Sequence, residues 1–133
     1  MNILKGEIEK IIIQDNLSLV GIMVGNIRLS AIVIDTPESE AYLKTGNAVN
    51  VIFKETEVII GKGKDHQVSL QNKLEGYVDS IEMGDLLCRL TLDTTVGKIV
   101  SVITKNAVDQ LHLKKGSEIT AMIKTNEMML QHD

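Results

Sequence analysis

Hydrophobic and polar positions alternate over most of this chain, which is the period of β-strands rather than that of helices. In the first half, β-branched and other apolar residues dominate several short stretches, which are separated by turn signals such as Gln14-Asp15-Asn16 and Gly25-Asn26. In the second strand Leu17, Leu19 and Met23 alternate with Ser18 and Ile22. The stretches predicted as strands are residues 3–13, 17–23, 27–34, 47–54 and 57–60.

The period changes once in this half, at Asp35-Thr36-Pro37-Glu38. A capping-type residue, a proline at the first helical position and an acid in the first turn are typical of a helix start. We therefore predict a short helix that ends by Lys44-Thr45-Gly46, with Gly46 as its terminator.

The second half repeats this order. The stretch LKKGSEITAMIKTNEMML, residues 113–130, matches LKTGNAVNVIFKETEVII, residues 43–60, at an offset of 70 residues (113 − 43). Four identical pairs besides the leading leucines follow this offset: Lys44 and Lys114, Gly46 and Gly116, Lys54 and Lys124, and Glu57 and Glu127. A fixed offset indicates a duplicated structural unit, although the offset is predicted to slip by about one position between the central strands. We expect a first domain over residues 1–62, a linker over 63–68 and a second domain over 69–133.

The predicted strands of the second unit are residues 73–82, 86–92, 98–103, 117–124 and 127–131, with a short helix from Thr104 to about Leu111. Five short strands with one helix between the third and fourth are typical of a small barrel of the oligonucleotide/oligosaccharide-binding type. The fold prediction is therefore all-β, with two such barrels in tandem and one short helix in each. A unit of about 65 residues is marginal alone, so each should pack on its twin or on another chain.

Composition and charge exclude several functions. The net charge is −4 and the isoelectric point is about 5.4, so a basic footprint for nucleic acid is absent. The aromatic residues are only Phe53, Tyr42 and Tyr77, too few to stack single-stranded bases along a groove. No apolar run approaches the roughly 20 residues of a membrane helix, and the first residues lack the features of a signal peptide. The single cysteine, Cys88, excludes an intramolecular disulfide and favours the cytoplasm.

Catalytic chemistry finds little support in the sequence. The three histidines, His66, His112 and His132, have no ligand-like spacing to one another or to Cys88. Cys88 falls on a core-facing strand position, where it serves as a small apolar residue. Phosphate-binding glycine motifs are absent from the chain. We therefore predict a protein that is not an enzyme and that has no cofactor and no metal held by protein ligands.

Anion-binding features remain. Thr104 stands where a strand becomes a helix, and its hydroxyl with the free N–H groups of a first helical turn can cradle an oxyanion. Lys124 ends a strand just before the turn Thr125-Asn126. Neutral donors precede the first strand of the second unit: Ser69, Gln71 and Asn72. The same residues also fit a purely structural reading, in which Thr104 is an N-cap, Lys124 a solvated strand end and the Ser69 segment part of a linker.

Four motifs within residues 69–130 carry a resemblance to a known family. They are Ser69-Leu70-Gln71-Asn72 followed by Gly76, Ile103-Thr104-Lys105-Asn106-Ala107, Leu113-Lys114-Lys115-Gly116, and Lys124-Thr125. They resemble, in that order, the S-A-R-N segment before a glycine, the I-T-x-x-S helix start, the L-x-x-G turn and the lysine plus small residue of the Mop domain. Mop domains belong to the TOBE superfamily and bind molybdate or tungstate.

The resemblance implies a function and a site. In the family the oxyanion lies between domains, so Ser69, Gln71, Asn72, Lys124 and Thr125 would come from one domain and Thr104 from a neighbour. Weaker candidates come from the first unit: Thr36 and Lys54. A pair of Mop units resembles the di-Mop proteins of molybdenum storage or homeostasis, which assemble as trimers. The implied partners are therefore copies of the same chain and the oxyanion, without nucleic acid or membrane.

The chain departs from the family pattern at several of these positions. Gln71 stands where the family has arginine, Ala107 replaces the helix-start serine, and Glu55 follows Lys54 where a small residue is expected. In the first unit, the acids of the Asp35-Thr36-Pro37-Glu38 segment replace I-T-x-x-S. These departures favour an alternative, in which the pair is an oligomerisation or regulatory interaction module with weak or lost oxyanion binding.

Overall fold

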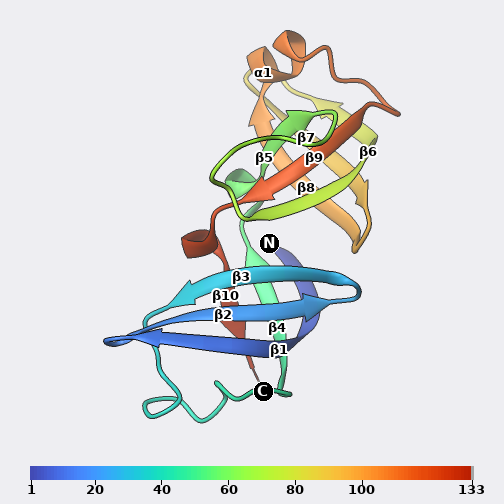
Figure 1. Ribbon diagram of the computed structural model, residues 1–133. Coiled ribbons are helices and arrows are strands. Elements are labelled where there is room, and N and C mark those ends of the chain that lie inside the picture. Colours follow the sequence, from blue (N-terminus) through green and yellow to red (C-terminus); the bar gives the residue numbers. More distant parts are fainter. Residues whose placement is uncertain (133) are drawn as a thin grey trace.

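Two five-stranded antiparallel sheets make up most of the computed structural model, which describes residues 1–132 (Figure 1). One sheet has the order β10-β4-β1-β2-β3 and the other β5-β9-β6-β7-β8. The strands of the first sheet are β1 (Asn2–Gln14), β2 (Leu17–Val24), β3 (Ile27–Val33), β4 (Ala48–Phe53) and β10 (Met129–Gln131). Those of the second are β5 (Ile59–Lys62), β6 (Asn72–Met83), β7 (Leu87–Thr94), β8 (Gly97–Thr104) and β9 (Glu118–Ile123). The remaining elements are the helix α1 (Lys105–Gln110) and the 3-10 turns η1 (Glu55–Glu57) and η2 (Thr125–Glu127). The all-β class and the tandem barrel-like sheets confirm the predicted fold.

The last strand of each unit is exchanged. Strand β5 follows η1 but pairs with β9 of the other sheet, where Ile60 lies opposite Ala121. Strand β10 returns the exchange by pairing with β4, where Leu130 lies opposite Val51. In Figure 1 the red β10 accordingly lies in the lower sheet and β5 in the upper one. The division expected at residues 63–68 does not coincide with the division into sheets, because each sheet takes one strand, β5 or β10, from the other half of the chain.

The repeat keeps its offset of 70 through the central strands. The register of β1 shifts between Ile8 and Lys10, and that of β6 shifts at the equivalent place. Opposite each shift lies the glycine of the repeated turn: the Gly46 N–H donates to the Ile8 carbonyl and the Gly116 N–H to that of Val78, both at 2.8 Å. The predicted slip of one position is therefore wrong. The turns Gly25-Asn26 and Thr95-Val96 have the same length, which keeps the offset constant.

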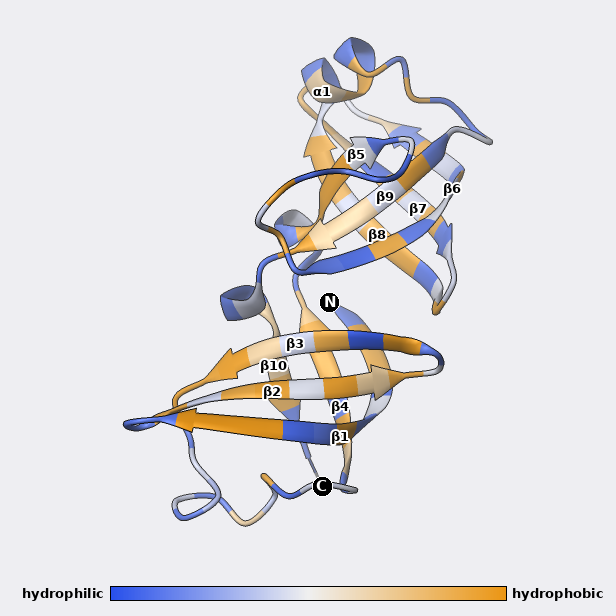
Figure 2. Cartoon of the chain, viewed as in Figure 1, coloured by the Kyte–Doolittle hydropathy of each residue, from blue (hydrophilic) through white to orange (hydrophobic). Residues whose placement is uncertain are grey.

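The cores follow strand alternation. On β2 the side chains of Ser18, Val20, Ile22 and Val24 are buried, which leaves Leu17 and Leu19 on the outer face. The equivalent face of β7 buries Cys88, Leu90 and Leu92, so Cys88 is a core residue as predicted. Figure 2 shows the same alternation of hydrophobic and hydrophilic positions along strands of both sheets. A single hydrophobic cluster includes residues of both units, so the barrels share one core.

Of the two predicted helices, only the second forms within residues 1–132. Helix α1 begins after Thr104, whose Oγ1 accepts the N–H of Ala107 at 3.0 Å. In the first unit, residues 37–39 form a turn instead. There the Ser39 Oγ accepts the Thr36 N–H at 2.9 Å, and the Glu40 N–H donates to the Thr36 carbonyl at 2.8 Å. Side-chain bonds of this kind compete with a continuing helix, which explains why the prediction of a helix here is wrong.

Two buried asparagines tie the barrels together. The side-chain amide of Asn2 donates to the Val100 carbonyl and accepts the Val100 N–H, both at 2.8 Å. The equivalent Asn72 donates to the Ser30 carbonyl at 2.9 Å and accepts the Ser30 N–H at 2.7 Å. Asn2 and Asn72 are only 7% and 1% exposed. Each amide thus pairs with the opposite barrel as a strand residue would, and the two clamps follow the internal repeat.

No helix of residues 1–132 has the length and apolar character needed to span a membrane.

Candidate oxyanion site

The lysine corner of the second unit forms where β9 ends. Strands β6 and β9 pair up to Asn72 and Ile123, so the next residues outward, Gln71 and Lys124, flank the same end of the sheet. Lys124 is exposed, and within residues 1–132 its ammonium forms no ion pair. Thr125 then opens η2. The structure therefore brings Gln71, which belongs to the Ser69 segment (residues 69–72), and the Lys124-Thr125 pair to one corner.

The polar residues of the Ser69 segment divide into two groups. Ser69 and Gln71 are exposed, and the Gln71 Nε2 donates to the Ser69 carbonyl at 3.5 Å. The amide of Asn72 is instead buried and already bonded at both ends to Ser30. Ser69 and Gln71 are thus open to solvent, with Gln71 at the same end of the sheet as the lysine, while Asn72 fixes this corner to the first barrel.

Thr104 and Thr36, the other two threonine candidates, lie away from this corner. Thr104 ends β8 and is exposed, and Figure 1 shows α1 at the outer end of the second barrel, far from η2 at the junction. It borders a pocket of about 400 Å³ together with Asn106. The Lys105 ammonium beside it bonds Asp109 at 2.9 Å, and this bond raises the lysine's pKa. Within one chain Thr104 and Lys124 do not meet, and Thr36 is likewise engaged in its own turn with Ser39.

The corresponding corner of the first unit is occupied by an ion pair. Glu55 directly follows Lys54, and its carboxylate accepts from the Arg89 guanidinium of the other barrel at 2.6 Å. Its second oxygen lies 3.6 Å from the N-terminal amine of Met1. Arg89 is a residue that the sequence analysis missed. The one sequence feature that marks Arg89 is the difference between the repeats, because the first unit has Leu19 at the equivalent position (89 − 70 = 19).

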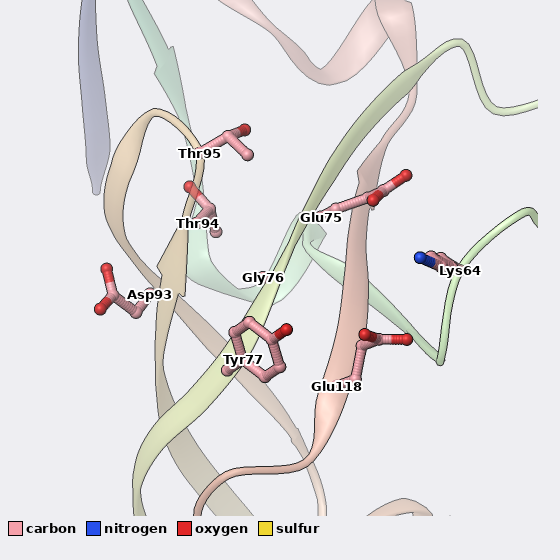
Figure 3. A pocket seen from close by; sticks show the side chains of 8 residues that line it. All are labelled: Lys64, Glu75, Gly76, Tyr77, Asp93, Thr94, Thr95 and Glu118. Atoms are coloured by element: carbon pink, nitrogen blue, oxygen red, sulfur yellow. The ribbon is translucent and has the colours of Figure 1, made fainter.

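The pocket in Figure 3 is not an oxyanion site. It has a volume of about 430 Å³ and lies along β6, where Gly76 lets the strands approach closely. Carboxylates outnumber amines around it, with Glu75, Asp93 and Glu118 against Lys64. None of the predicted site residues lines it. Its negative charge would repel an oxyanion, so the exposed corners remain the candidates.

Two of the three histidines, His132 and His66, pack against other residues of the fold. The ring of His132 stacks on that of Tyr42 with centroids 4.1 Å apart. Burial, and then the carboxylate of Asp35, raise the pKa of Tyr42. The Nε2 of His66 is buried without a hydrogen-bond partner in the described part of the chain, and the ring fills the space beside Gly61. Within residues 1–132, no cluster of three or more histidine, cysteine or acidic side chains could hold a metal ion.

The second unit is of the TOBE type, since the TOBE domain family matches residues 69–130. Molybdenum-pterin-binding protein 1 of Clostridium pasteurianum is 34% identical over 64 residues, which cover 47% of this chain and 94% of that protein. MopB of Rhodobacter capsulatus is 31% identical over 104 residues, covering 77% of this chain and 38% of that protein. A solved structure of the cytoplasmic molybdate-binding protein ModG, with molybdate bound, is similar over 99% of this chain and 96% of its own, at 30% identity and a TM-score of 0.90. The chain belongs to the Mop family and carries two Mop units.

Proposed function

We propose that this protein binds molybdate or tungstate reversibly in the cytoplasm and serves molybdenum storage or homeostasis without catalysing a reaction. The observation that carries the proposal is the Lys124 corner, where Gln71, Thr125 and an ammonium without an ion pair among residues 1–132 lie at one end of the sheet. The likeness to molybdate-bound ModG over nearly the whole chain supports it. The alternative of an interaction module without a ligand is not favoured, because that likeness includes both units.

The chemistry of binding follows from the donors present. Lys124 supplies a compact positive charge, while Ser69 and Thr125 supply hydroxyl groups. Thr104 of a neighbouring copy supplies a further donor: its oxygen already accepts the Ala107 N–H, which leaves its hydroxyl proton for an oxyanion. No coordinate bond to molybdenum is needed. Discrimination against sulfate, which has the same charge and shape, would rest on the size of the space between the donors.

The distance between Thr104 and Lys124 makes a second copy part of this proposal. We propose a homo-oligomer, a trimer by analogy with the di-Mop family, in which one copy contributes the lysine corner and the next its helix start. The outer face of the first barrel offers a surface for such contacts. Ile12, Leu19 and Ile32 lie side by side across three strands and are 48%, 39% and 40% exposed.

Isothermal titration calorimetry with molybdate and with tungstate tests the function, with Lys124→Ala as the main variant and Lys54→Ala as its matched control. Both lysines are exposed ends of equivalent strands, so neither change should disturb the fold. A hydrogen bond to a charged group contributes about 1.5–3 kcal/mol, so Lys124→Ala should weaken binding by a factor of about ten or more. Lys54→Ala should leave the affinity close to that of the natural chain.

Two results would count against the proposal. If neither oxyanion gives heat at millimolar concentration and neither raises the melting temperature, the proposed binding function is refuted. Equal losses in the two variants would instead show that both corners hold the ligand.

A further inference from the structure

The duplication allows each residue of one corner to be compared with its counterpart in the other. Glu55 occupies the place of Thr125, and Arg89 occupies the place of Leu19. The first-unit corner has therefore gained one acid and one base relative to the second. These two added charges are also bonded to each other, at 2.6 Å across the barrel junction.

The groups around the Glu55 carboxylate are those that recognise oxyanions. A guanidinium binds carboxylates and tetrahedral oxyanions through the same N–H donors, and the amine of Met1 lies 3.6 Å from the second oxygen of Glu55. The carboxyl side chain is only 21% exposed, whereas that of Arg89 is 47% exposed. The Glu55 carboxylate thus places a negative charge inside the corner, bonded to the Arg89 guanidinium and close to the Met1 amine.

We propose that Glu55 is a specificity-determining residue that closes the Lys54 corner to external oxyanions by serving as its internal anion. This inference rests on the proposed function, because it concerns which corners take molybdate. An incoming oxyanion at this corner has to displace the carboxylate from Arg89 or remain close to its negative charge. The second corner has Thr125 instead, a hydroxyl that donates to an oxyanion and carries no charge.

Equilibrium dialysis against molybdate, followed by elemental analysis of molybdenum bound per chain, tests this assignment. The main variant is Glu55→Thr, which reproduces the Thr125 arrangement and leaves Arg89 with Lys54. Glu55→Gln keeps the size of the side chain and serves if the threonine variant folds poorly. Glu57→Thr is the matched control, because Glu57 lies in the same turn and forms no ion pair within residues 1–132.

The natural chain and Glu57→Thr should bind the same amount of molybdate, and Glu55→Thr should bind more per chain. Adding Lys54→Ala to Glu55→Thr should remove that gain, since the new sites would include the lysine. A folded Glu55→Thr or Glu55→Gln variant with no gain over the natural chain overturns the inference, whatever the natural chain binds. Failure of the natural chain to bind, in contrast, overturns the proposed function at the Lys124 corner.

Discussion

The Asn72 clamp allows a quantitative prediction about how the barrels are held together. Replacing Asn72 with alanine removes two hydrogen bonds, of 2.7 and 2.9 Å, to the backbone of Ser30. Each contributes about 0.5–1.5 kcal/mol, and a backbone group left buried without a partner costs about 1–3 kcal/mol. Because Asn72 is 1% exposed, water does not readily replace the lost bonds. We expect Asn72→Ala to lower the free energy of unfolding by about 2–4 kcal/mol.

For a chain of this length, that loss corresponds to a fall in melting temperature of about 10 °C. Differential scanning calorimetry and urea unfolding should both detect it, at one fixed protein concentration because assembly makes stability depend on concentration. Asn50→Ala is the matched control. Asn50 also carries a side-chain amide on a strand, but its bond to Gln131 is exposed and 3.3 Å long. The control should cost less than about 0.5 kcal/mol.

The equivalent Asn2→Ala variant gives an independent repeat, since Asn2 makes the same two bonds to Val100. If Asn72→Ala costs no more than Asn50→Ala, the clamps do not hold the barrels together, and the shared apolar core alone would have to account for the junction.

Two further predictions concern the helix start and a surface ion pair. Thr104→Ala should lower stability by about 1 kcal/mol through loss of the N-cap and should also weaken molybdate binding, whereas Thr104→Ser should keep both, as measured by thermal unfolding and calorimetry. If Thr104→Ala and Thr104→Ser bind molybdate equally, the hydroxyl is only a cap. The Arg28 guanidinium holds the pKa of Glu9 below its ordinary value of 4.5, so the pair stabilises the fold above that pH and loses its effect as pH falls through the lowered pKa. NMR titration should show a higher pKa for the Glu9 carboxyl in Arg28→Ala than in the natural chain, and an unchanged pKa would contradict this cause.

The elements that the sequence predicts well are those that local chemistry decides. Alternation located the strands, and the N-cap at Thr104 located α1, because each depends on residues close in sequence. The helix expected after Asp35 failed for an equally local reason, namely the Thr36–Ser39 turn. Thr36 and Ser39 can form such a turn, but the same segment also carries the capping and proline pattern that predicts a helix.

Local sequence patterns do not predict the exchange of strands β5 and β10 between the sheets. Ile59 and Met129 begin closing strands of similar apolar character, and either strand fits the alternation of either barrel. Which barrel receives it depends on the direction in which η1 and η2 turn the chain, and on pairings between residues far apart in sequence. The Arg89–Glu55 bond escaped for the same reason, since 34 residues separate its members.

The sequence motifs predict Lys124, Thr125 and the Ser69 segment as site residues, and the pairing of β6 with β9 places Gln71 and Lys124 at the same end of the sheet. What the motifs did not reveal is that Asn72 is fully engaged with Ser30. Their roles toward an oxyanion stay predictions that the lysine variants test.

The exchanged strands also decide what would happen if the connection between the two units were cut. A protease that cleaves within residues 63–68 would leave two fragments, each holding the closing strand of the other's sheet. Neither fragment can complete its own sheet in the native pairing, so the nicked protein should stay together under native conditions. Refolding it from denaturant would become a bimolecular reaction. The linker therefore favours assembly in both rate and equilibrium, because it keeps each closing strand at high effective concentration beside the sheet that needs it.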